Sequence, residues 1–378
     1  MLEAIFWIAA GLIVFTHLGY PLVLWLLVRL PGRRRAALAR SDGGAEQLPD
    51  VSLIIAAYNE EAVIVEKVAN TLLLDYPPER LGIVVASDGS TDRTAELARL
   101  AGAHLVLELP RFGKVAAQNA AAERARGSIL VFSDANSVWE RDALRRLVEP
   151  FADPEVGYAC GQVRFTSASG DSLEGAYWRY EMAVRKLESR LGGITAGNGA
   201  IYAVRRDAYL WLPPSGSHDL SFPFELARRG LRSVYVPAAR ASEKMVPTLA
   251  GEFARKRRMM SGLWDIVVGE RMISPRGYGP LFAFQIASHR LLRYLTPLLH
   301  LIVLGTNIAL FGEGWVYAAT LGIQAAVLAA AALARLAPLA PLRWARYYVL
   351  VTASIAAGLW DRFRRGPVGA WEHAEGTR

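Results

Sequence analysis

Short polar clusters follow apolar segments at three places in the chain, and their side chains are of the kinds that bind ligands. Ala57-Tyr58-Asn59-Glu60 is the first cluster, the run SDGSTD at 87–92 is the second, and Ser133-Asp134-Ala135-Asn136 is the third. Carboxylate and amide oxygens accept hydrogen bonds from hydroxyl groups and coordinate hard cations. Helix capping or a turn would explain any one cluster. Three together indicate a shared binding site, provided that the fold brings them to one place.

The apolar segments before these clusters are short and continuous, which is typical of parallel strands buried on both faces. They are VSLIIAA (51–57), GIVVAS (82–87), AHLVLEL (103–109) and SILVFSD (128–134). Helical segments are expected between and after them, at 60–74, 91–101, 114–126 and 140–151. This alternation predicts an α/β fold with a doubly wound, mostly parallel sheet. Ligands bind at the carboxyl ends of such strands, where the three clusters lie.

The bulk composition indicates membrane segments around this domain. Of the 378 residues, 53% are hydrophobic and only 21% are charged, an unusual balance for a soluble domain. The apolar run from Ala4 to Leu30 is long enough to span a bilayer and lacks the features of a signal peptide. Arg29 and four arginines between positions 33 and 40 follow it. The positive-inside rule places that flank, and with it the α/β domain, in the cytoplasm.

Further apolar stretches at about 294–311, 315–334 and 345–360 predict C-terminal spans, while 277–293 mixes apolar and basic residues and suits the membrane surface. If all three stretches span, the Arg-rich end at 362–365 lies outside, against the positive-inside rule. The sequence leaves that conflict open. We expect a multi-pass protein of the inner membrane, divided into a transmembrane helix (1–30), a linker (31–50), a catalytic domain (51–268), an interfacial segment (269–293), transmembrane helices (294–362) and a tail (363–378).

The charge and cysteine content narrow the classes of partner. The formal net charge of +8 suits anionic lipid head groups or anionic substrates. No nucleic-acid-binding module is recognisable, so nucleic acid is not an expected partner. Cys160 is the only cysteine and cannot form an internal disulfide, and no zinc-site spacing surrounds it. We expect it to be a small buried apolar residue.

A longer set of motifs resembles the inverting glycosyltransferase family 2. The motifs are VSLIIAAYNE, VVASDGSTD, GKVAAQNAA, FSDAN, GNGAIYAVRRD, HDLSFPFELARRG and FARKRRMMSGLWD. They cover about 51–268 in family order, and the membrane flanks are similar to those of the cellulose, hyaluronan and poly-N-acetylglucosamine synthases. The resemblance implies the A-type nucleotide-sugar fold and transfer from a nucleotide sugar to a lipid-linked or saccharide acceptor. A uridine diphosphate donor is the family default, and guanosine diphosphate stays open.

The resemblance also implies donor-binding residues. Asp88 matches the acid that contacts uracil or its ribose, and Ala57, Tyr58 and Glu60 would line the same pocket. Lys114 and Asn119 lie on the helix that this family places around the donor. A lysine there compensates the charge of the pyrophosphate.

A divalent metal, Mg²⁺ or Mn²⁺, is implied as well. Asp134 matches the first acid of the family's D-x-D motif, whose metal bridges the two phosphates. The second acid is replaced by Asn136. An amide oxygen is a weaker ligand for a hard cation than a carboxylate.

The acceptor side rests on Asp219, which matches the family's general base. It would take the proton of the acceptor hydroxyl during a direct displacement, which inverts the anomeric configuration. His218 stands before it, where the family usually has an acid. The turn Gly197-Asn198-Gly199 resembles the acceptor-side turn, where glycines permit close approach of a sugar.

The final motif departs most from the family. Arg255, Arg258 and Met259 stand in place of Gln-x-x-Arg-Trp. Arg258 matches directly and would pair with the diphosphate, as would the neighbouring Arg255. Trp264, one turn further on, is a candidate substitute for the missing tryptophan. Its loss from the usual position favours a single-transfer enzyme over a processive synthase that translocates its polymer, although the second reading stays open.

Two other classes of protein fit these residues less well. A catalytically inactive scaffold with a transferase fold would have no reason to keep Asp88, Asp134 and Asp219. A nucleotidyltransferase would want a Gly-rich phosphate loop after the first strand, and Ala57-Tyr58-Asn59-Glu60 is not one.

Overall fold

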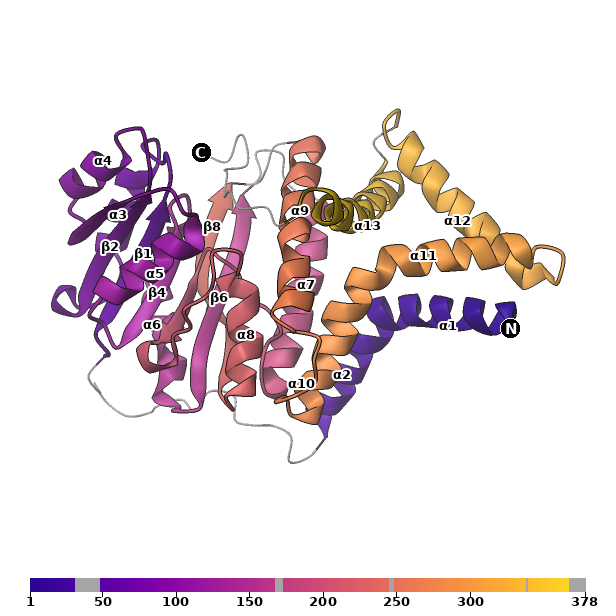
Figure 1. Cartoon of the computed structure of the whole chain (residues 1–378), viewed down its shortest axis with the longest axis horizontal. Helices are drawn as coiled ribbons and strands as arrows, with labels where there is room; N and C mark the ends of the chain where they lie inside the picture. The colour runs from indigo at the N-terminus through magenta and orange to yellow at the C-terminus, as the bar shows by residue number, and fades with distance from the viewer. Residues whose placement is uncertain (31–47, 167–172, 245–247, 338, 367–378) are drawn as a thin grey trace.

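A computed structural model describes residues 1–30, 48–166, 173–244, 248–337 and 339–366. Most of the linker predicted at 31–50 and most of the tail predicted at 363–378 lie outside these residues. The described chain forms a sheet domain and a set of long helices that project from it (Figure 1).

One twisted sheet organises the domain, in the order β3-β2-β1-β4-β7-β6-β8-β5. β3, β2, β1 and β4 are parallel, β7 is antiparallel to both β4 and β6, and β8 runs parallel to β6 and antiparallel to β5. The strands are β1 (Val51–Ala57), β2 (Leu81–Asp88), β3 (Leu105–Leu109), β4 (Ile129–Asp134), β5 (Val138–Trp139), β6 (Val156–Thr166), β7 (Tyr202–Arg205) and β8 (Arg232–Lys244).

The predicted α/β architecture is confirmed. All four predicted strands are present, and the predicted helices appear as α3 (Ile64–Leu72), α4 (Thr94–Leu100), α5 (Lys114–Arg124) and α6 (Ala143–Val148). Every residue of β1 is buried, as the continuous apolar run requires, because helices cover both faces of the sheet. The antiparallel half of the sheet, from β5 to β8, was not predicted as strands.

Three further helices pack between the sheet and the projecting helices. They are α7 (Leu173–Leu191), α8 (His218–Arg228) and α9 (Leu249–Trp264). α7 and α8 both contact β8, and Figure 1 shows all three beside the antiparallel half of the sheet. They therefore connect the sheet to the rest of the molecule.

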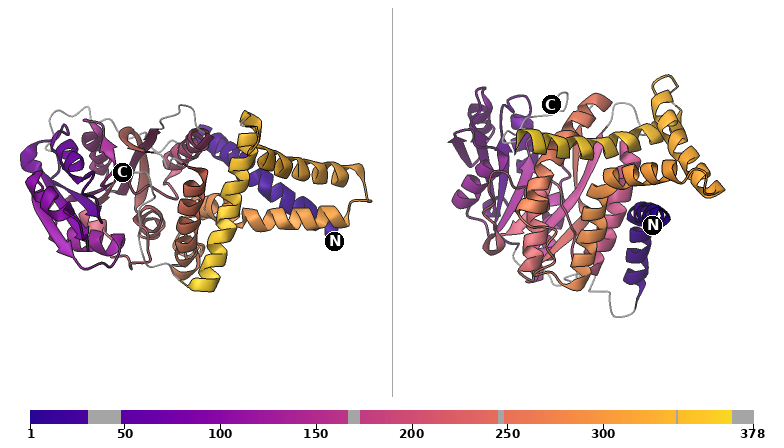
Figure 2. Two further views of the ribbon diagram at one scale, coloured as in Figure 1. Left: turned by 90° about the horizontal axis from the view of Figure 1, so that it is seen from above. Right: turned by 45° about the vertical axis from the view of Figure 1, so that its right-hand side comes forward.

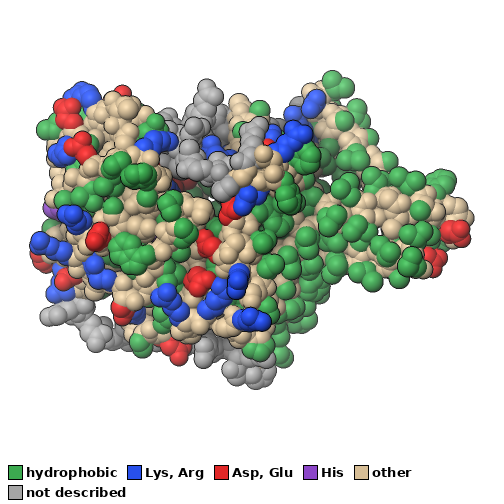
Figure 3. All heavy atoms as spheres, in the orientation of Figure 1, with side chains coloured by type: hydrophobic (Ala, Val, Ile, Leu, Met, Phe, Trp, Pro, Cys, Tyr) green, Lys and Arg blue, Asp and Glu red, His purple; other side chains and the backbone are tan. Residues whose placement is uncertain are grey.

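Within the described residues, three helices are long and apolar enough to cross a membrane: 2–29, 280–309 and 315–333. The first joins α1 (Leu2–Val14) to α2 (Tyr20–Arg29), the second joins α10 (Pro280–Gln285) to α11 (Leu292–Ala309), and the third is α12 (Trp315–Leu333). A π-helical turn interrupts each of the first two. Their exposed surface is largely hydrophobic where they project from the domain (Figure 3).

The last helix, α13 (Ala340–Arg365), is not among the candidate spans. It covers the predicted span at 345–360, but charged residues at both ends lower its hydropathy. α13 runs across the direction of α11 and α12 and packs along α9 (Figure 2). Its exposed side chains include Trp344, Trp360 and Phe363, which suit a membrane surface.

The interfacial segment predicted at 269–293 is not a separate element, because Pro280–Ala309 is one helix. Its basic residues are tolerated because they are buried against acids of α7. His289 Nδ1 lies 2.7 Å from the Glu188 carboxylate, and Arg293 pairs with Glu181. Tyr20 of α2 also donates to Glu188, at 2.6 Å. This buried network fixes the membrane helices to the sheet domain.

Candidate active site

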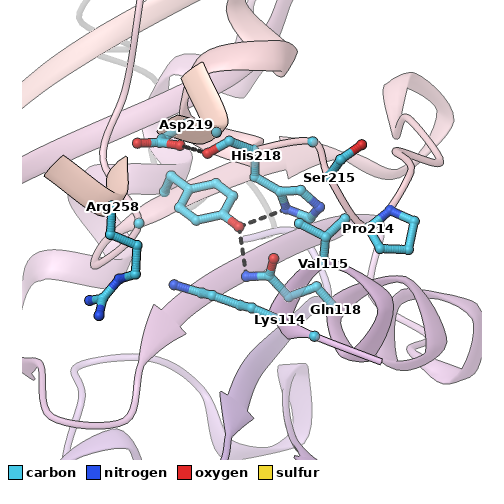
Figure 4. A pocket seen from close by; sticks show the side chains of 14 residues that line it. Lys114, Val115, Gln118, Pro214, Ser215, His218, Asp219 and Arg258 are labelled. Atoms are coloured by element: carbon cyan, nitrogen blue, oxygen red, sulfur yellow. Dashed lines mark hydrogen bonds between the residues drawn. The ribbon is translucent and has the colours of Figure 1, made fainter. Parts of the chain in front are cut away.

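A pocket with a volume of about 230 Å³ lies where α5, α8 and α9 meet the end of the sheet. Figure 4 shows Lys114, Arg258 and Asp219 around it, from three separate elements. Its lining consists of Gly113, Lys114, Val115, Gln118, Gly199, Tyr202, Pro214, Ser215, Gly216, Ser217, His218, Asp219, Arg258 and Gly262. Of the predicted site residues, the pocket brings together Lys114, Gly199, His218, Asp219 and Arg258.

The first two polar clusters bind mainly to each other. The backbone N–H groups of Asn59 and Glu60 donate to Ser90 Oγ (3.1 Å) and Thr94 Oγ1 (2.7 Å). In return, the Asn59 carbonyl oxygen Oδ1 accepts from the Thr91 N–H at 2.8 Å. Asn59 adopts a φ of 52°, a left-handed conformation that asparagine tolerates. These clusters therefore lock the ends of β1 and β2 together, and Ala57 and Glu60 are buried within that lock.

Asp88 also holds backbone in place. Its carboxylate accepts from the N–H groups of Phe112 at 2.8 Å and Gly113 at 3.0 Å, and only 1% of the residue is exposed. Asp88 is absent from the pocket lining, and its contact with a base or ribose stays a prediction. Asp88 fixes the loop that starts α5, so it positions Lys114 rather than presenting its own charge to the pocket.

Arg111, which the sequence did not indicate as a site residue, lies beside Tyr58. The Arg111 guanidinium lies 3.2 Å from the centroid of the Tyr58 ring, a cation–π stack. Gly89 faces the same arginine, since a Cβ at Gly89 would lie 2.8 Å from Arg111 Cβ. A planar stack of this kind at the β1 and β2 ends is a suitable wall for a nucleoside. The only signal was the position of Arg111, three residues before the predicted helix at 114.

Lys114 and Asp134 form the ionic centre of the site. Lys114 Nζ donates to the Asp134 carboxylate, and both side chains keep about a fifth to a quarter of their surface exposed. Burial alone would lower the pKa of Lys114, but Asp134, and then Asp219, outweigh it and raise the pKa. Lys114 therefore stays positively charged. Gly199 lies over the pair, because a Cβ there would be 3.2 Å from Lys114 Nζ and 3.5 Å from an Asp134 oxygen.

The residues at the end of β4 fit a divalent metal that keeps other ligands. Within the described residues, no group of three or more His, Cys, Asp or Glu side chains could enclose an ion. Asp134 offers one partly exposed carboxylate, and Asn136 follows two residues later. Mg²⁺ and similar cations are commonly held by one or two carboxylates together with substrate phosphates and water. Lys114 would then share or release the Asp134 carboxylate when such a complex binds.

Asp219 stands at the first turn of α8, where the helix dipole favours a carboxylate. Ser217 Oγ donates to its carboxylate, and its backbone carbonyl accepts from the Gly197 N–H at 2.6 Å. The carboxylate is thus held by its own turn and lies at the pocket wall opposite Lys114 (Figure 4). Its role as a general base stays a prediction at this point.

His218 is buried in an aromatic cage and kept uncharged. Gln118 Nε2 donates to Tyr202 Oη at 3.1 Å, and Tyr202 Oη lies 2.7 Å from His218 Nδ1. A tyrosine that donates to Nδ1 leaves the proton of the neutral ring on Nε2. Burial, and then Lys114, lower the pKa of His218 to about 3. The position where the family resemblance implies an acid therefore presents a neutral ring here, and the sequence did not predict the Gln118–Tyr202 pair.

Two arginines of the basic helix α9, Arg258 and Arg255, have different surroundings. Arg258 lines the pocket. Arg255 pairs with Glu252 on its own helix, at 2.9 Å and 3.0 Å, and is absent from the pocket lining. Its contact with the donor stays a prediction. Trp264 packs edge-on against Tyr294 at 6.2 Å and is absent from the pocket lining. It does not replace the tryptophan that the motif lacks.

Two predicted asparagines are structural. Asn119 donates to the Leu212 carbonyl at 2.9 Å and accepts from Tyr209 Oη at 2.8 Å, which anchors the loop before the pocket. Asn198 is buried and donates to the Gly161 carbonyl at 2.8 Å. Gly197 has no room for a side chain, since a Cβ would lie 2.0 Å from Tyr158 Oη. Of this turn, only Gly199 faces the pocket.

Comparison with known proteins identifies similar sequences and structures. Residues 52–211 match the profile of Glycosyl transferase family 2. A poly-beta-1,6-N-acetyl-D-glucosamine synthase of Staphylococcus aureus is 25% identical over 243 residues, 61% of this chain and 58% of that protein. The chain thus spans under two thirds of that relative. An N-acetylglucosaminyltransferase of Rhizobium meliloti is 26% identical over 302 residues, 71% of this chain and 70% of that protein.

One solved structure is similar over almost the whole chain. It is a mannosyltransferase from Pyrobaculum calidifontis in complex with GDP-Man and Mn²⁺, with a TM-score of 0.73 and 25% identity. The similarity covers 96% of this chain and 99% of that one. The membrane-side helices are therefore part of the shared architecture together with the sheet.

Proposed function

We propose that this chain, which carries a family 2 glycosyltransferase domain, transfers a hexosyl unit from a nucleoside diphosphate sugar to an acceptor hydroxyl at the membrane. The transfer inverts the anomeric configuration. One observation carries the proposal: Asp219, Lys114 and Arg258 converge on one pocket from α8, α5 and α9. A carboxylate opposite two cations provides a base for the acceptor and counter-charge for a leaving diphosphate.

The side chains divide the reaction between them. Asp219 takes the proton from the acceptor hydroxyl while that oxygen attacks the anomeric carbon. The bond from the anomeric carbon to the diphosphate oxygen breaks on the opposite side, so the configuration inverts. Lys114 and Arg258 pair with the negative charge that develops on the leaving nucleotide. Asp88 and the lock between the β1 and β2 ends hold the loop that aims Lys114.

We propose Asp134 and Asn136 as the protein ligands of a divalent metal. Such a metal would supply positive charge that stabilises the leaving diphosphate. The Mn²⁺ complex of the similar mannosyltransferase supports this proposal.

The donor sugar is proposed only as a class. The resemblance of the motifs favours uridine diphosphate, whereas the similar structure contains GDP-Man. We propose a lipid-linked or saccharide acceptor, because α9, which lines the pocket, also packs on the membrane-side helix α13. Since Met259 and Trp264 provide no aromatic platform in the pocket, single transfer is favoured over processive synthesis.

We propose a membrane topology in which the two basic flanks no longer conflict with the positive-inside rule. With spans at 2–29, 280–309 and 315–333, and α13 on the surface, the Arg-rich segments after the first span and at 362–365 fall on one side. We propose that this side is the cytoplasm of a cell with an inner membrane, in agreement with the positive-inside rule.

The side of each segment can be tested with introduced cysteines. Cys160 is fully buried, and burial raises the pKa of its thiol to about 11, so the native chain gives little background labelling. Exposed Glu313, between α11 and α12, and exposed Glu108, in β3, are suitable sites. A membrane-impermeant thiol reagent should label Glu313→Cys in intact cells and Glu108→Cys only after lysis. The reverse pattern would overturn the proposed orientation.

The reaction itself is tested by a donor screen on purified protein in lipid nanodiscs. UDP- and GDP-sugars are offered with Mn²⁺ or Mg²⁺, with and without a polyprenyl phosphate or oligosaccharide acceptor, and nucleotide release is measured. Acceptor-dependent release with one donor supports the proposal, and product length over time separates single transfer from polymerisation. No turnover of any donor with any acceptor would refute it.

A further inference from the structure

The active-site helix α9 has two functional faces, and the residues of each face recur every four positions. Arg258 and Gly262, four residues apart, line the pocket. Arg257, Ser261 and Asp265, also four residues apart, lie on the neighbouring face. Residues at this spacing share one side of a helix. The second face meets α13, the helix that follows the last candidate span.

The contact between α13 and α9 is close at its centre. Gly358 of α13 has no side chain where the helices cross, and a Cβ there would lie 2.6 Å from Met260 Cβ and 2.8 Å from the Ser261 backbone nitrogen. Backbones at this separation leave little room for one helix to slide or rotate on the other. Met260 and Ser261 are two and three residues after Arg258, so the crossing lies within one turn of the arginine.

Two ion pairs of opposite polarity flank this crossing on the α9 side, one before Met260 and one after Ser261. Arg257 of α9 forms a bidentate pair with Asp361 of α13, at 2.5 Å and 2.7 Å. Arg362 of α13 pairs with Asp265, which directly follows α9, at 2.6 Å. The acids are 14% and 17% exposed and the arginines 39% and 35%, so the pairs are partly screened by solvent and contribute mainly through their geometry. Each helix supplies one cation and one acid, which specifies both their register and their rotation.

We propose that α13 positions Arg258 for the donor diphosphate, with Gly358, Asp361 and Arg362 as its positioning residues. None of them lines the pocket. They act by setting the rotation of α9, and a small rotation of that helix moves the guanidinium at the end of its long side chain. The inference rests on the proposed function, because it takes Arg258 to bind the donor's diphosphate.

The test measures donor KM, kcat and nucleotide affinity of full-length protein in nanodiscs. We expect Asp361→Asn to raise the donor KM and weaken nucleotide binding about 5- to 20-fold while kcat changes less than threefold. Reversing the pair, with Arg257→Asp and Asp361→Arg together, should restore KM to within threefold of wild type. Arg364→Gln is the matched control, because Arg364 is exposed and lies over Trp360 of its own helix.

The outcomes separate this inference from the function it rests on. Arg258→Gln should weaken nucleotide binding at least as much as Asp361→Asn. If Arg258→Gln weakens binding and Asp361→Asn does not, the positioning role is refuted and the proposed function stands. If neither weakens binding, the assignment of Arg258 to the diphosphate is refuted. Asp361→Asn with a lower kcat, unchanged KM and no recovery on charge reversal would also refute positioning.

Discussion

Replacing Asp219 by asparagine should remove the base and leave the pocket otherwise intact. Asparagine has nearly the same shape, and its carbonyl oxygen can still accept from Ser217 Oγ. The 2.6 Å bond from the Gly197 N–H goes to the backbone of residue 219 and is unaffected. General base catalysis contributes about 10²- to 10⁴-fold, which corresponds to about 2.7 to 5.4 kcal/mol in the activation free energy. We expect kcat to fall by that factor.

Donor affinity, in contrast to kcat, should not decrease in this variant. The Asp219 charge contributes to the raised pKa of Lys114, so the two groups interact across the pocket. Removing the negative charge leaves more of the field of Lys114 for the diphosphate. Donor KM should therefore stay constant or decrease slightly in Asp219→Asn.

The assay is acceptor-dependent nucleotide release at saturating donor, together with donor affinity from calorimetry. Asp142→Asn serves as the control, since Asp142 is half-exposed, pairs with Arg146 of the same segment and is absent from the pocket lining. A kcat within threefold of wild type would show that Asp219 is not the base. A large rise in donor KM at constant kcat would show that it contributes to ground-state binding instead.

Three further predictions concern the same pocket. His218→Gln should make the stability of the fold less sensitive to acid. The pKa of His218 is about 3 in the folded protein and 6.5 for the free side chain, so the unfolded state binds an extra proton below pH 6.5. The stability of the wild-type protein therefore falls as the pH decreases from about 6.5. The wild-type thermal midpoint should drop more than that of the variant between pH 7.5 and 5.5, and equal drops would count against a buried neutral ring. Gly199→Val should cover the Lys114–Asp134 pair and reduce donor affinity at least tenfold. An unchanged thermal midpoint would show that the fold is intact. An unchanged donor affinity would show that the donor binds elsewhere. Asp134→Ala should abolish the response of nucleotide affinity to added Mn²⁺, and a retained response would exclude Asp134 as the metal ligand.

The parallel half of the sheet could be predicted from sequence because its pattern is local. Runs such as VSLIIAA are buried on both faces, and their apolar character does not depend on which strand lies beside them. The second half lacks this property. β7 has four residues, and β6 and β8 are irregular, with bulges near Gly161. Their pairing depends on contacts between residues far apart in the chain.

The site residues could be predicted by type more readily than by role. Asp219 and Arg258 reach the pocket as expected. Asp88 and Asn119 do not, because backbone groups of the neighbouring loops take up their hydrogen-bonding atoms. A motif identifies a polar residue at the end of a strand, but it does not show which way the side chain turns. Tyr202 was missed for the same reason, since its link to His218 exists only in the folded chain.

The long contact between α9 and α13 has a consequence for how the protein is made. Lys114 and Asp134, on the donor side of the site, are synthesised early, whereas α13 follows α9, α11 and α12 in the chain. Until it docks, α9 lacks the neighbour that contacts it through Gly358. Nascent and truncated chains would therefore hold a nucleotide sugar poorly, so competence for catalysis would arrive together with completed membrane insertion.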